Sequence, residues 1–451
     1  MNPILHKIIF TPHKLVLIHV GLGLLFALLP QLFIPFFYLL AIISFSWIFS
    51  SNKSAKNISL EVVVFFYLMM FESVSRLLAL DPVIPWELGK YLTILFVVYL
   101  VYKQKIRTNL LVILAIVLIV LMLIKGVTWK AFFFNATIFL GLLLTQETFK
   151  IIKFGMFQLL RLLQTILLPL YVFLGASVNQ IQDFQNRRYE LGSNSILAQI
   201  PSNQVATYMG LAFFLSLIPF FFNNTYRKKW TSYIAPGAFL LVGLLSFSRG
   251  GMITAVIGLL VIALGNIVSG KLNYLIYMLL FLVISIPFAI YINGVSGGNL
   301  FLRYQGETRG TLVGNKEKTL DTYTTGRVSI FLGDWETFKN NWLFGVEIGE
   351  SQHYREETEF QHSHVELSRV LAEHGILGFL GFLAVIFSAI KSFKQKSDNR
   401  IKYLMFSLWV IAFATTFHGA TRTILPFIFF NLGNLLLVTT NRKFKTENVQ
   451  T

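Results

Sequence analysis

Arg249 stands in the segment Ser248-Arg249-Gly250-Gly251, between two long apolar runs of the sequence. The two glycines let the backbone approach a ligand closely, and a helix that begins here would offer free amide N–H groups. The guanidinium group of an arginine matches the oxygens of a phosphate. The segment therefore indicates a phosphate-binding turn. The alternative is an interfacial arginine that reaches lipid headgroups.

Two more candidates lie at the edges of helices expected in or beside the long polar segment 293–369. Arg327 precedes a helix expected at 328–340, where an arginine is otherwise solvated or paired with a carboxylate. His364 lies where the polar segment meets the next apolar run. Histidine is the side chain best suited to general-base chemistry near neutral pH. A lone histidine in a polar loop more often has no such role.

Several patterns speak against a metal or a nucleotide cofactor. His362 and His364 are two residues apart and do not share a helix face, and no H-E-x-x-H spacing occurs. The aspartates are isolated, without the D-x-D pair of metal-chelated nucleotide-sugar transfer, and there is no P-loop. The chain has no cysteine. We therefore expect no metal and no cofactor.

Other charged residues are secondary candidates. Arg187 and Arg188 lie in a polar stretch, and Arg422 separates the last two apolar runs. These arginines would add positive charge to a site for a polyanion. Glu72 and Arg76 are four residues apart within an apolar run, so we expect them to pair with each other.

The elements that position these residues are predicted to be membrane helices. Of 451 residues, 55% are hydrophobic and 13% are charged, whereas about a quarter of the residues in a soluble domain are charged. Apolar runs of spanning length follow one another through the chain. The sequence therefore predicts an all-α membrane protein, a polytopic bundle of about 12–14 transmembrane helices with one large periplasmic loop subdomain.

The net charge of +17 is unevenly distributed. Segment 293–369 holds 8 basic and 11 acidic residues, and the rest of the chain holds 30 and 10. The excess lies in short clusters between apolar runs, which is typical of cytoplasmic loops and not of a nucleic-acid groove. Both chain ends are then expected in the cytoplasm, with a retained signal anchor first. Arg249, Arg422 and the polar segment are expected on the opposite face.

Three regions follow from this reading. Residues 1–292 form an N-terminal transmembrane bundle with an outer loop at 179–203. Residues 293–369 form the large periplasmic loop with short helices, and residues 370–451 form C-terminal transmembrane helices and a cytoplasmic tail. Chemistry on the outer face needs a donor that carries its own activation, since nucleotide sugars are absent there.

The order of the motifs resembles the O-antigen ligase/O-antigen polymerase superfamily. The chain carries the Ser-Arg-Gly-Gly turn at 248–251 and Thr325-Gly326-Arg327, followed by Trp342-Leu343-Phe344-Gly345. It then carries His364-Val365-Glu366-Leu367, followed by Glu373-His374-Gly375. Arg187, Arg188 and Gly192 before Asn203 give a weaker match. Val365 stands where the family commonly has asparagine, which leaves the orientation of His364 open and raises the weight of His362.

The resemblance implies a multi-pass bacterial inner-membrane enzyme with its active site facing the periplasm. Its donor would be a glycan linked to undecaprenyl diphosphate, and its acceptor a lipid A–core sugar or a growing glycan, among membrane lipids. On this basis Arg249, Gly250 and Arg327 are expected to bind the pyrophosphate. His364 would accept the proton of the acceptor hydroxyl, with inversion at the anomeric carbon.

Two alternatives stay open at the level of sequence. A ligase and a polymerase differ in the acceptor, which the motifs do not identify. A flippase or transporter of lipid-linked glycans would instead show internal repeats and charges at the membrane midplane, not one long polar loop. No repeat is visible in the sequence.

Overall fold

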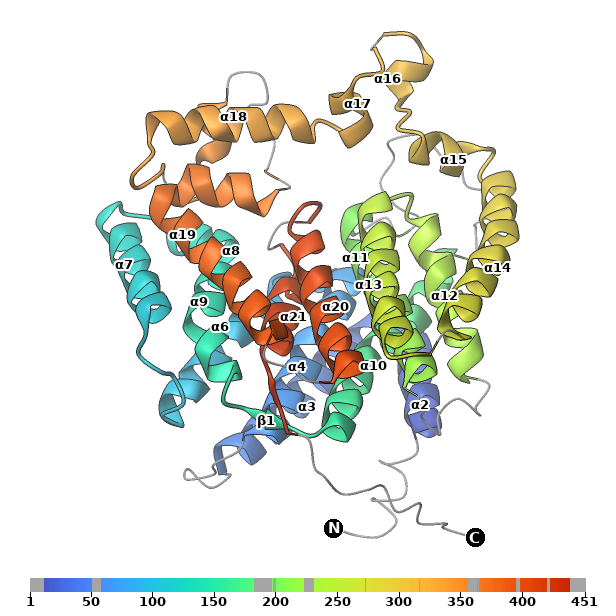
Figure 1. Ribbon diagram of the computed structural model, residues 1–451, viewed down its shortest axis with the longest axis horizontal. Coiled ribbons are helices and arrows are strands. Elements are labelled where there is room, and N and C mark those ends of the chain that lie inside the picture. The colour runs from blue at the N-terminus through green and yellow to red at the C-terminus, as the bar shows by residue number, and fades with distance from the viewer. Residues whose placement is uncertain are drawn as a thin grey trace.

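The computed structural model shows upright helices packed as a bundle, with a layer of shorter helices across one end (Figure 1). It describes residues 12–50, 58–181, 197, 200–222, 231–271, 273–315, 317–346, 348–355, 363, 365–394, 398–419 and 422–438. Within these residues the only strands are β1 (Lys153–Phe154) and β2 (Leu436–Leu437), which pair in parallel. The predicted all-α polytopic class is confirmed.

Most of the described helices belong to the bundle. In chain order they are α2 (Pro12–Leu28), α3 (Phe33–Ser50), α4 (Ser59–Met70), α5 (Glu72–Leu78), α6 (Leu88–Tyr102), α7 (Leu110–Ile124), α8 (Trp129–Asn135), α9 (Thr137–Phe149), α10 (Met156–Ile181), α11 (Ser202–Phe221), α12 (Thr231–Leu245), α13 (Arg249–Val268), α14 (Asn273–Val295), α19 (Glu366–Lys394), α20 (Asn399–Thr415) and α21 (Leu425–Gly433). The 3-10 turn η1 (Pro30–Leu32) joins α2 to α3.

Five helices are long and apolar enough to cross a membrane by length and composition: Pro30–Ser50, Met156–Asn179, Ser202–Phe221, Arg249–Val268 and Glu366–Lys394. The pair α8 and α9, bent by 57°, would make a sixth span. Apolar helices of 10–17 residues stand beside them, and these are shorter than the roughly 20 residues of a straight span. A polytopic membrane protein is therefore shown, while the count of 12–14 spans stays a prediction.

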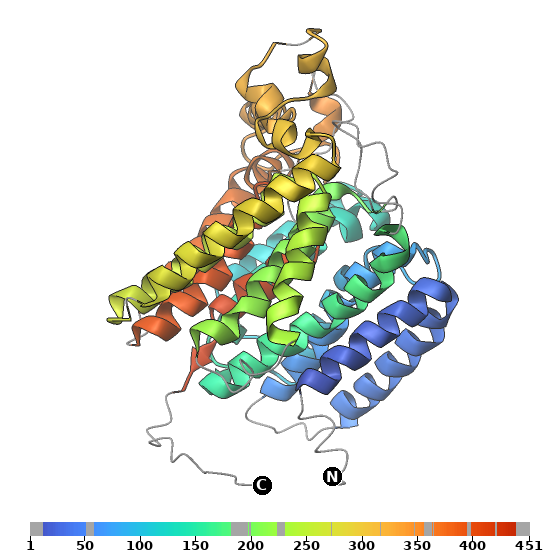
Figure 2. The same ribbon diagram turned by 90° about the vertical axis from the view of Figure 1, so that its right-hand side faces the viewer.

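Close helix packing in the bundle depends on small residues. Helices α2 and α10 run side by side in Figure 2, and Gly23 meets Gly175 where they cross. A Cβ at Gly23 would lie 2.2 Å from the carbonyl oxygen of Val172. Two backbones in contact through glycine are typical of helix pairs in membranes, where dispersion forces replace the hydrophobic effect between helices.

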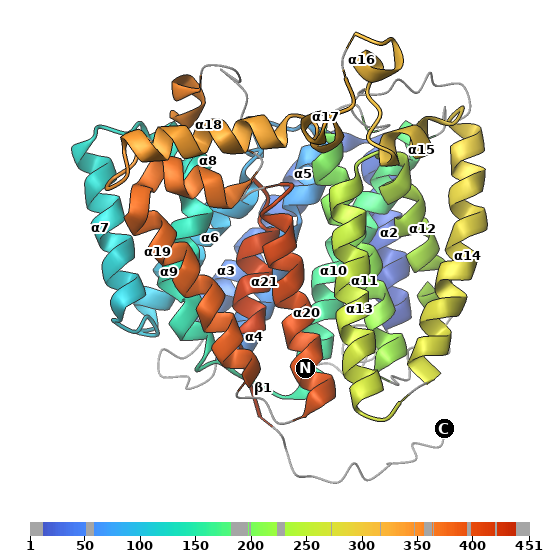
Figure 3. The ribbon, with the colours of Figure 1, turned by 45° about the horizontal axis from the view of Figure 1, so that its top comes forward.

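The polar segment after α14 forms the layer across the end of the bundle, which we call the cap layer, as Figure 3 shows. Its elements are α15 (Asn299–Tyr304), α16 (Arg309–Leu312), α17 (Leu320–Thr324), α18 (Arg327–Asn340) and the 3-10 turn η3 (Ser351–Tyr354). The helix predicted at 328–340 is confirmed as α18. It begins after Thr325 and Gly326, which both have left-handed backbone angles that separate α17 from α18.

Helix α19 (Glu366–Lys394) is not one straight helix. It begins at Glu366 and breaks at Gly375, where φ is 61° and ψ is −153°. The segment before the break lies beneath α18, and the longer segment after it descends into the bundle (Figure 1). The sequence does not predict the break at Gly375, because hydropathy carries no information about backbone angles.

The C-terminal apolar run is also not one continuous helix. Helix α21 is followed by β2, which pairs with β1. Irregular backbone is tolerated at membrane depth where protein buries it and polar groups bond it. Asn434 supplies such groups, because its side chain bonds Gln146 and accepts hydrogen bonds from Ser388 and Ser392.

Candidate functional site

The Arg249 turn lies where the sequence placed it, between α12 and α13, and it faces the cap layer. Arg249 is the first residue of α13. Its guanidinium donates hydrogen bonds to the carbonyl oxygens of Tyr304 and Tyr323 and lies 4.5 Å from the centroid of the Tyr323 ring. Arg249 therefore joins the bundle to α15 and α17, which belong to the polar segment.

The glycines after Arg249 serve helix packing. A Cβ at Gly250 would lie 2.5 Å from Cγ of His418, and one at Gly251 would lie 2.1 Å from the carbonyl oxygen of Ala206. Close contact with α11 and with the turn after α20 thus accounts for both glycines without a ligand. The expectation that Gly250 touches a pyrophosphate stays a prediction.

Arg249, Arg303 and Arg327 form a cationic group, which we call the arginine cluster. Burial, together with the charges of Arg249 and Arg303, lowers the pKa of Arg327 to about 10. Burial and the charge of Arg249 also lower the pKa of Arg303. Nε of Arg327 is buried without a hydrogen-bond partner in the described part of the chain. Three guanidinium groups therefore repel one another at this end of the bundle.

Two other arginines, Arg76 and Arg355, are buried and neutralised by carboxylates. Nη2 of Arg76 lies 2.7 Å from Oε1 of Glu72, as the sequence predicted. Nε of Arg355 lies 3.6 Å from Oδ1 of Asp334. No such ion pair joins Arg249, Arg303 or Arg327 to a carboxylate within the described residues. A cationic group with no internal counter-charge is suited to an anionic ligand, since each unpaired buried cation is costly to desolvate.

Arg369, in the motif that begins at position 364, is neutralised in the same way. Its guanidinium lies 2.7 Å from Oε1 of Glu366 and 3.2 Å from Oε2 of Glu373. It also donates to the carbonyl oxygen of Asn135 at 3.0 Å. The acidic residues of this motif therefore hold α19 against the end of α8.

His418 is a functional candidate that the sequence reasoning missed. It lies in the turn after α20, 4% exposed, against Gly250 and within the field of Arg327. Its Nδ1 lies 3.1 Å from the carbonyl oxygen of Ala414, and its Nε2 lies 3.0 Å from Oγ1 of Thr207. Burial, with the charge of Arg327, lowers the pKa of His418 to about 4. The imidazole is thus neutral at neutral pH.

Arg422 holds Ser363, the residue that precedes the predicted catalytic histidine in the sequence. Its Nη2 donates to the carbonyl oxygen of Ser363 at 3.0 Å, and its own carbonyl oxygen accepts from Arg76 at 2.8 Å. The backbone N–H of Glu366 donates to the carbonyl oxygen of Thr416 at 2.8 Å. Residues 363 and 366, on either side of position 364, are therefore both tied to the turn between α20 and α21.

Four sequence-predicted residues lie outside the described residues. They are the histidines His362 and His364 and the arginines Arg187 and Arg188. Their expected roles stay predictions. In the described residues, no group of three or more His, Asp or Glu side chains is arranged to hold a metal ion.

The segment 342–346 and the break in α19 pack together through two glycines, an arrangement we call the glycine interlock. Gly345 and Gly375 both have positive φ, and a Cβ at Gly375 would lie 2.5 Å from the carbonyl oxygen of Leu343. A Cβ at Gly345 would lie 2.5 Å from the carbonyl oxygen of Glu373. The ammonium group of Lys125 lies 2.8 Å from the carbonyl oxygen of Gly345. Segment 342–346 is thereby docked onto the break in α19.

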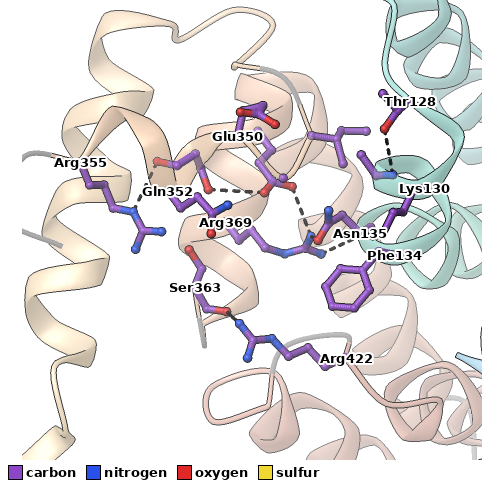
Figure 4. Close-up of a pocket in the computed structure, with 15 residues that line it drawn as sticks. Thr128, Lys130, Phe134, Asn135, Glu350, Gln352, Arg355, Ser363, Arg369 and Arg422 are labelled. Carbon is purple, nitrogen blue, oxygen red and sulfur yellow. Dashed lines mark hydrogen bonds and ion pairs between the residues drawn. The ribbon is translucent and has the colours of Figure 1, made fainter. Parts of the chain in front are cut away.

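A cavity of about 540 Å³ opens between α8, segment 348–355 and the start of α19 (Figure 4). Arg422 and Ser363 line one side of it, and Lys130, Phe134 and Asn135 line the other. The arginine cluster does not line this cavity. The turn between α20 and α21 contributes to both places, because His418 faces Gly250 of the cluster side and Arg422 lines the cavity.

Comparison with known protein families gives a match for part of the chain. Residues 234–383 match the family model described as O-antigen ligase. The match includes Arg249, Arg303, Arg327 and position 364, and it ends before His418 and Arg422. No curated protein matches the chain. The resemblance drawn from the three motifs is confirmed.

Proposed function

We propose that this membrane protein, which carries an O-antigen ligase domain, transfers a glycan from undecaprenyl diphosphate to an acceptor hydroxyl at the periplasmic face. The match to the O-antigen ligase family model supports glycosyl transfer of the O-antigen ligase or polymerase type in general. The observation that carries the finer proposal is the arginine cluster, which is cationic and has no internal carboxylate partner in the described residues.

A lipid diphosphate would supply the anion that the arginine cluster lacks. Arg327 and Arg249 bond two phosphate groups in this proposal, and Arg303 adds a third positive charge. Arginine forms charge-assisted, often bidentate bonds to phosphate oxygens. The lipid tail would remain among the bundle helices, because the cluster lies where the bundle meets the cap layer. Arg187 and Arg188 are proposed to add charge from the outer loop.

The chemical step forms one bond, breaks another and transfers one proton. The acceptor oxygen bonds to the anomeric carbon while the bond from that carbon to the diphosphate oxygen breaks, and the diphosphate leaves with the electron pair. His364 accepts the proton of the attacking hydroxyl, with His362 as the alternative. Attack opposite the leaving group inverts the anomeric carbon. The arginines stabilise the charge that develops on the diphosphate, so the enzyme's work is positioning and electrostatic stabilisation.

The outward orientation of the site is part of the proposal. The basic clusters of the sequence lie between apolar runs, and segment 293–369 is acidic in balance. The positive-inside bias then places the cap layer on the non-cytoplasmic side. A donor already activated by diphosphate is suited to that compartment. In a bacterium with two membranes, this is the periplasmic face of the inner membrane.

The experiment is a transfer assay with protein purified in detergent, an undecaprenyl-diphosphate-linked glycan and a glycan acceptor. Arg327→Ala and His364→Ala are each expected to lose about 100-fold in rate, since one charge-stabilising group contributes on the order of 10²-fold. Lys339→Ala is the control, because Lys339 is exposed and pairs with Glu336. Transfer by both site variants at the wild-type rate would overturn the mechanism.

The same assay separates an enzyme from a flippase. Detergent removes any membrane gradient and any second compartment, so a transporter of lipid-linked glycans joins no sugars there. Acceptor identity separates the ligase from the polymerase. Transfer to a lipid A–core glycan indicates a ligase, and transfer to a second lipid-linked repeat indicates a polymerase.

A further inference from the structure

The cavity at the end of α8 is separate from the arginine cluster and has a different chemical character. Its volume of about 540 Å³ lies within the range of about 300–1,000 Å³ that is typical of small-ligand sites. Its charged lining residues are of both signs: the acidic Glu350 and Glu373, and the basic Lys130, Arg355, Arg369 and Arg422. Arg355 and Arg369 are already paired with carboxylates, which leaves fewer unpaired cations here than in the arginine cluster. The cavity therefore suits a ligand that is rich in hydroxyl groups and has no concentrated negative charge.

The cavity walls are fixed by contacts that leave the space open. Asn135 accepts hydrogen bonds from Arg369 through its backbone and side-chain oxygens. Gly349 lies so close to Asn135 that a Cβ there would be 2.6 Å from Nδ2. Arg422 is held by Ser363. Side chains held by such contacts pre-organise a binding site and lower the entropy cost of binding.

Two groups in the cavity lack an internal partner among the described residues. Oε1 of Gln352 is buried without a hydrogen-bond donor. Lys130 lines the cavity and makes no ion pair within the described part of the chain. Phe134, which is 36% exposed, offers an apolar ring beside them. A sugar hydroxyl would satisfy the amide oxygen, and the C–H face of a sugar ring would cover the phenyl ring.

The position of the cavity relates it to the reaction. Ser363, which lines it, directly precedes His364 in the chain. Arg422, which also lines it, bonds the carbonyl oxygen of Ser363. A ligand in the cavity therefore contacts Ser363, the residue before the proposed general base in the sequence, and the arginine cluster lies across the turn between α20 and α21.

We infer that this cavity is the subsite for the acceptor glycan, with Lys130, Phe134 and Gln352 contacting the sugar that receives the chain. The inference rests on the proposed function, because it assigns the second substrate of the same reaction. The ligand is a short oligosaccharide with a free hydroxyl group. Its source is a lipid A–core glycan or a lipid-linked repeat, and the test below distinguishes the two.

The first test uses thiol labelling, because the chain has no cysteine. Ala131→Cys places a thiol in the cavity lining, and Val313→Cys places one on the exposed cap outside it. Both purified full-length variants react with a soluble maleimide in the presence of three probes. The probes are a lipid A–core glycolipid, an undecaprenyl-diphosphate-linked repeat and undecaprenyl diphosphate alone.

One glycan probe is expected to slow labelling at position 131 at least fivefold and leave position 313 unchanged, and the probe that does so identifies the source. Undecaprenyl diphosphate alone is expected to give no protection at position 131. Equal protection by undecaprenyl diphosphate would assign the cavity to the donor and overturn the inference. Labelling at position 131 that neither glycan slows would overturn it as well.

The second test is kinetic. Lys130→Ala and Gln352→Ala are each expected to raise the acceptor KM about tenfold, the effect of losing one hydrogen bond to a ligand. Thermal stabilisation by undecaprenyl diphosphate should stay as in the wild type. Lys130→Arg keeps the charge and should recover part of the loss. An unchanged acceptor KM in both variants would contradict the inference. If the wild type itself transfers no glycan, the proposed function fails, while the labelling result still decides whether the cavity binds glycan.

Discussion

At the scale of single residues, the site is defined by which charges are paired. Arg76, Arg355 and Arg369 each lie within 4 Å of a carboxylate oxygen. Arg303 and Arg327 have lowered pKa values because burial and neighbouring arginines act on them together. The contrast separates arginines that hold the fold from arginines available to an anionic substrate.

His418 gives a pH dependence of stability. Its pKa falls from 6.5 to about 4 on folding, mainly because the ring is buried. The unfolded chain therefore binds a proton more readily between these values, so the stabilisation is complete above pH 6.5 and is lost as the pH falls towards 4. We expect the wild type to lose more thermal stability than His418→Asn between pH 7 and pH 4.5. Thermal unfolding of both proteins in detergent measures the difference, and parallel pH curves would contradict it.

Residue types alone revealed part of this site. The pair Glu72 and Arg76 followed from helical spacing, and Arg249 stood out between two apolar runs. Arg303 and His418 were not singled out, because their importance comes from contacts with residues far away in the sequence. A periodic pattern in the sequence indicates which residues share a helix face, but not which residues from distant segments contact each other.

At the scale of elements, the break in α19 organises the end of the bundle. Gly375 allows segment 342–346 to bond directly to the backbone of α19, with Val346 N–H donating to the carbonyl oxygen of Ala372 at 2.8 Å. The segment that carries Arg369 and Glu373 thus lies beneath α18 instead of continuing the span. Helix α18 was predictable from its period, whereas this break requires backbone angles that only glycine adopts easily.

The glycine interlock predicts a large effect of one methyl group. Gly375→Ala would put a Cβ 2.5 Å from the carbonyl oxygen of Leu343 at a backbone position with φ of 61°. We expect a loss of about 3 kcal/mol of stability, from strain and steric overlap together. A lower unfolding temperature in detergent would show it. Gly294→Ala is the matched control, because nothing lies within 4 Å of a Cβ at that position. An equal effect of both substitutions would contradict the interlock.

At the scale of the whole molecule, the charge distribution matches a protein with two different faces. The excess of basic residues lies outside segment 293–369, and that segment forms the cap layer on one end of the bundle. The Arg249 turn, the cap layer and Arg422 were expected on one face from topology, and the hydrogen bonds among them place them at one end. The number of membrane spans was harder to predict from the sequence, because broken and short helices do not coincide with the apolar runs.

The orientation can be tested on cells with the outer membrane opened. Val313→Cys lies on the cap, and Asn399→Cys lies at the start of α20, a 17-residue helix whose other end joins the turn near the cap. If the cap faces outward as proposed, a membrane-impermeant maleimide labels position 313 in intact spheroplasts and position 399 only after lysis. The reverse labelling would place the cap in the cytoplasm.

The binding of undecaprenyl diphosphate tests the central claim, that the arginine cluster holds the lipid diphosphate. Binding to the purified protein is compared with binding of undecaprenol, which has the same chain and no phosphate. We expect the wild type to prefer the diphosphate, and Arg327→Gln to lose roughly 10–100-fold of that preference, the effect of one lost charge-assisted contact. An Arg327→Gln protein that keeps the full preference of the wild type would contradict the claim.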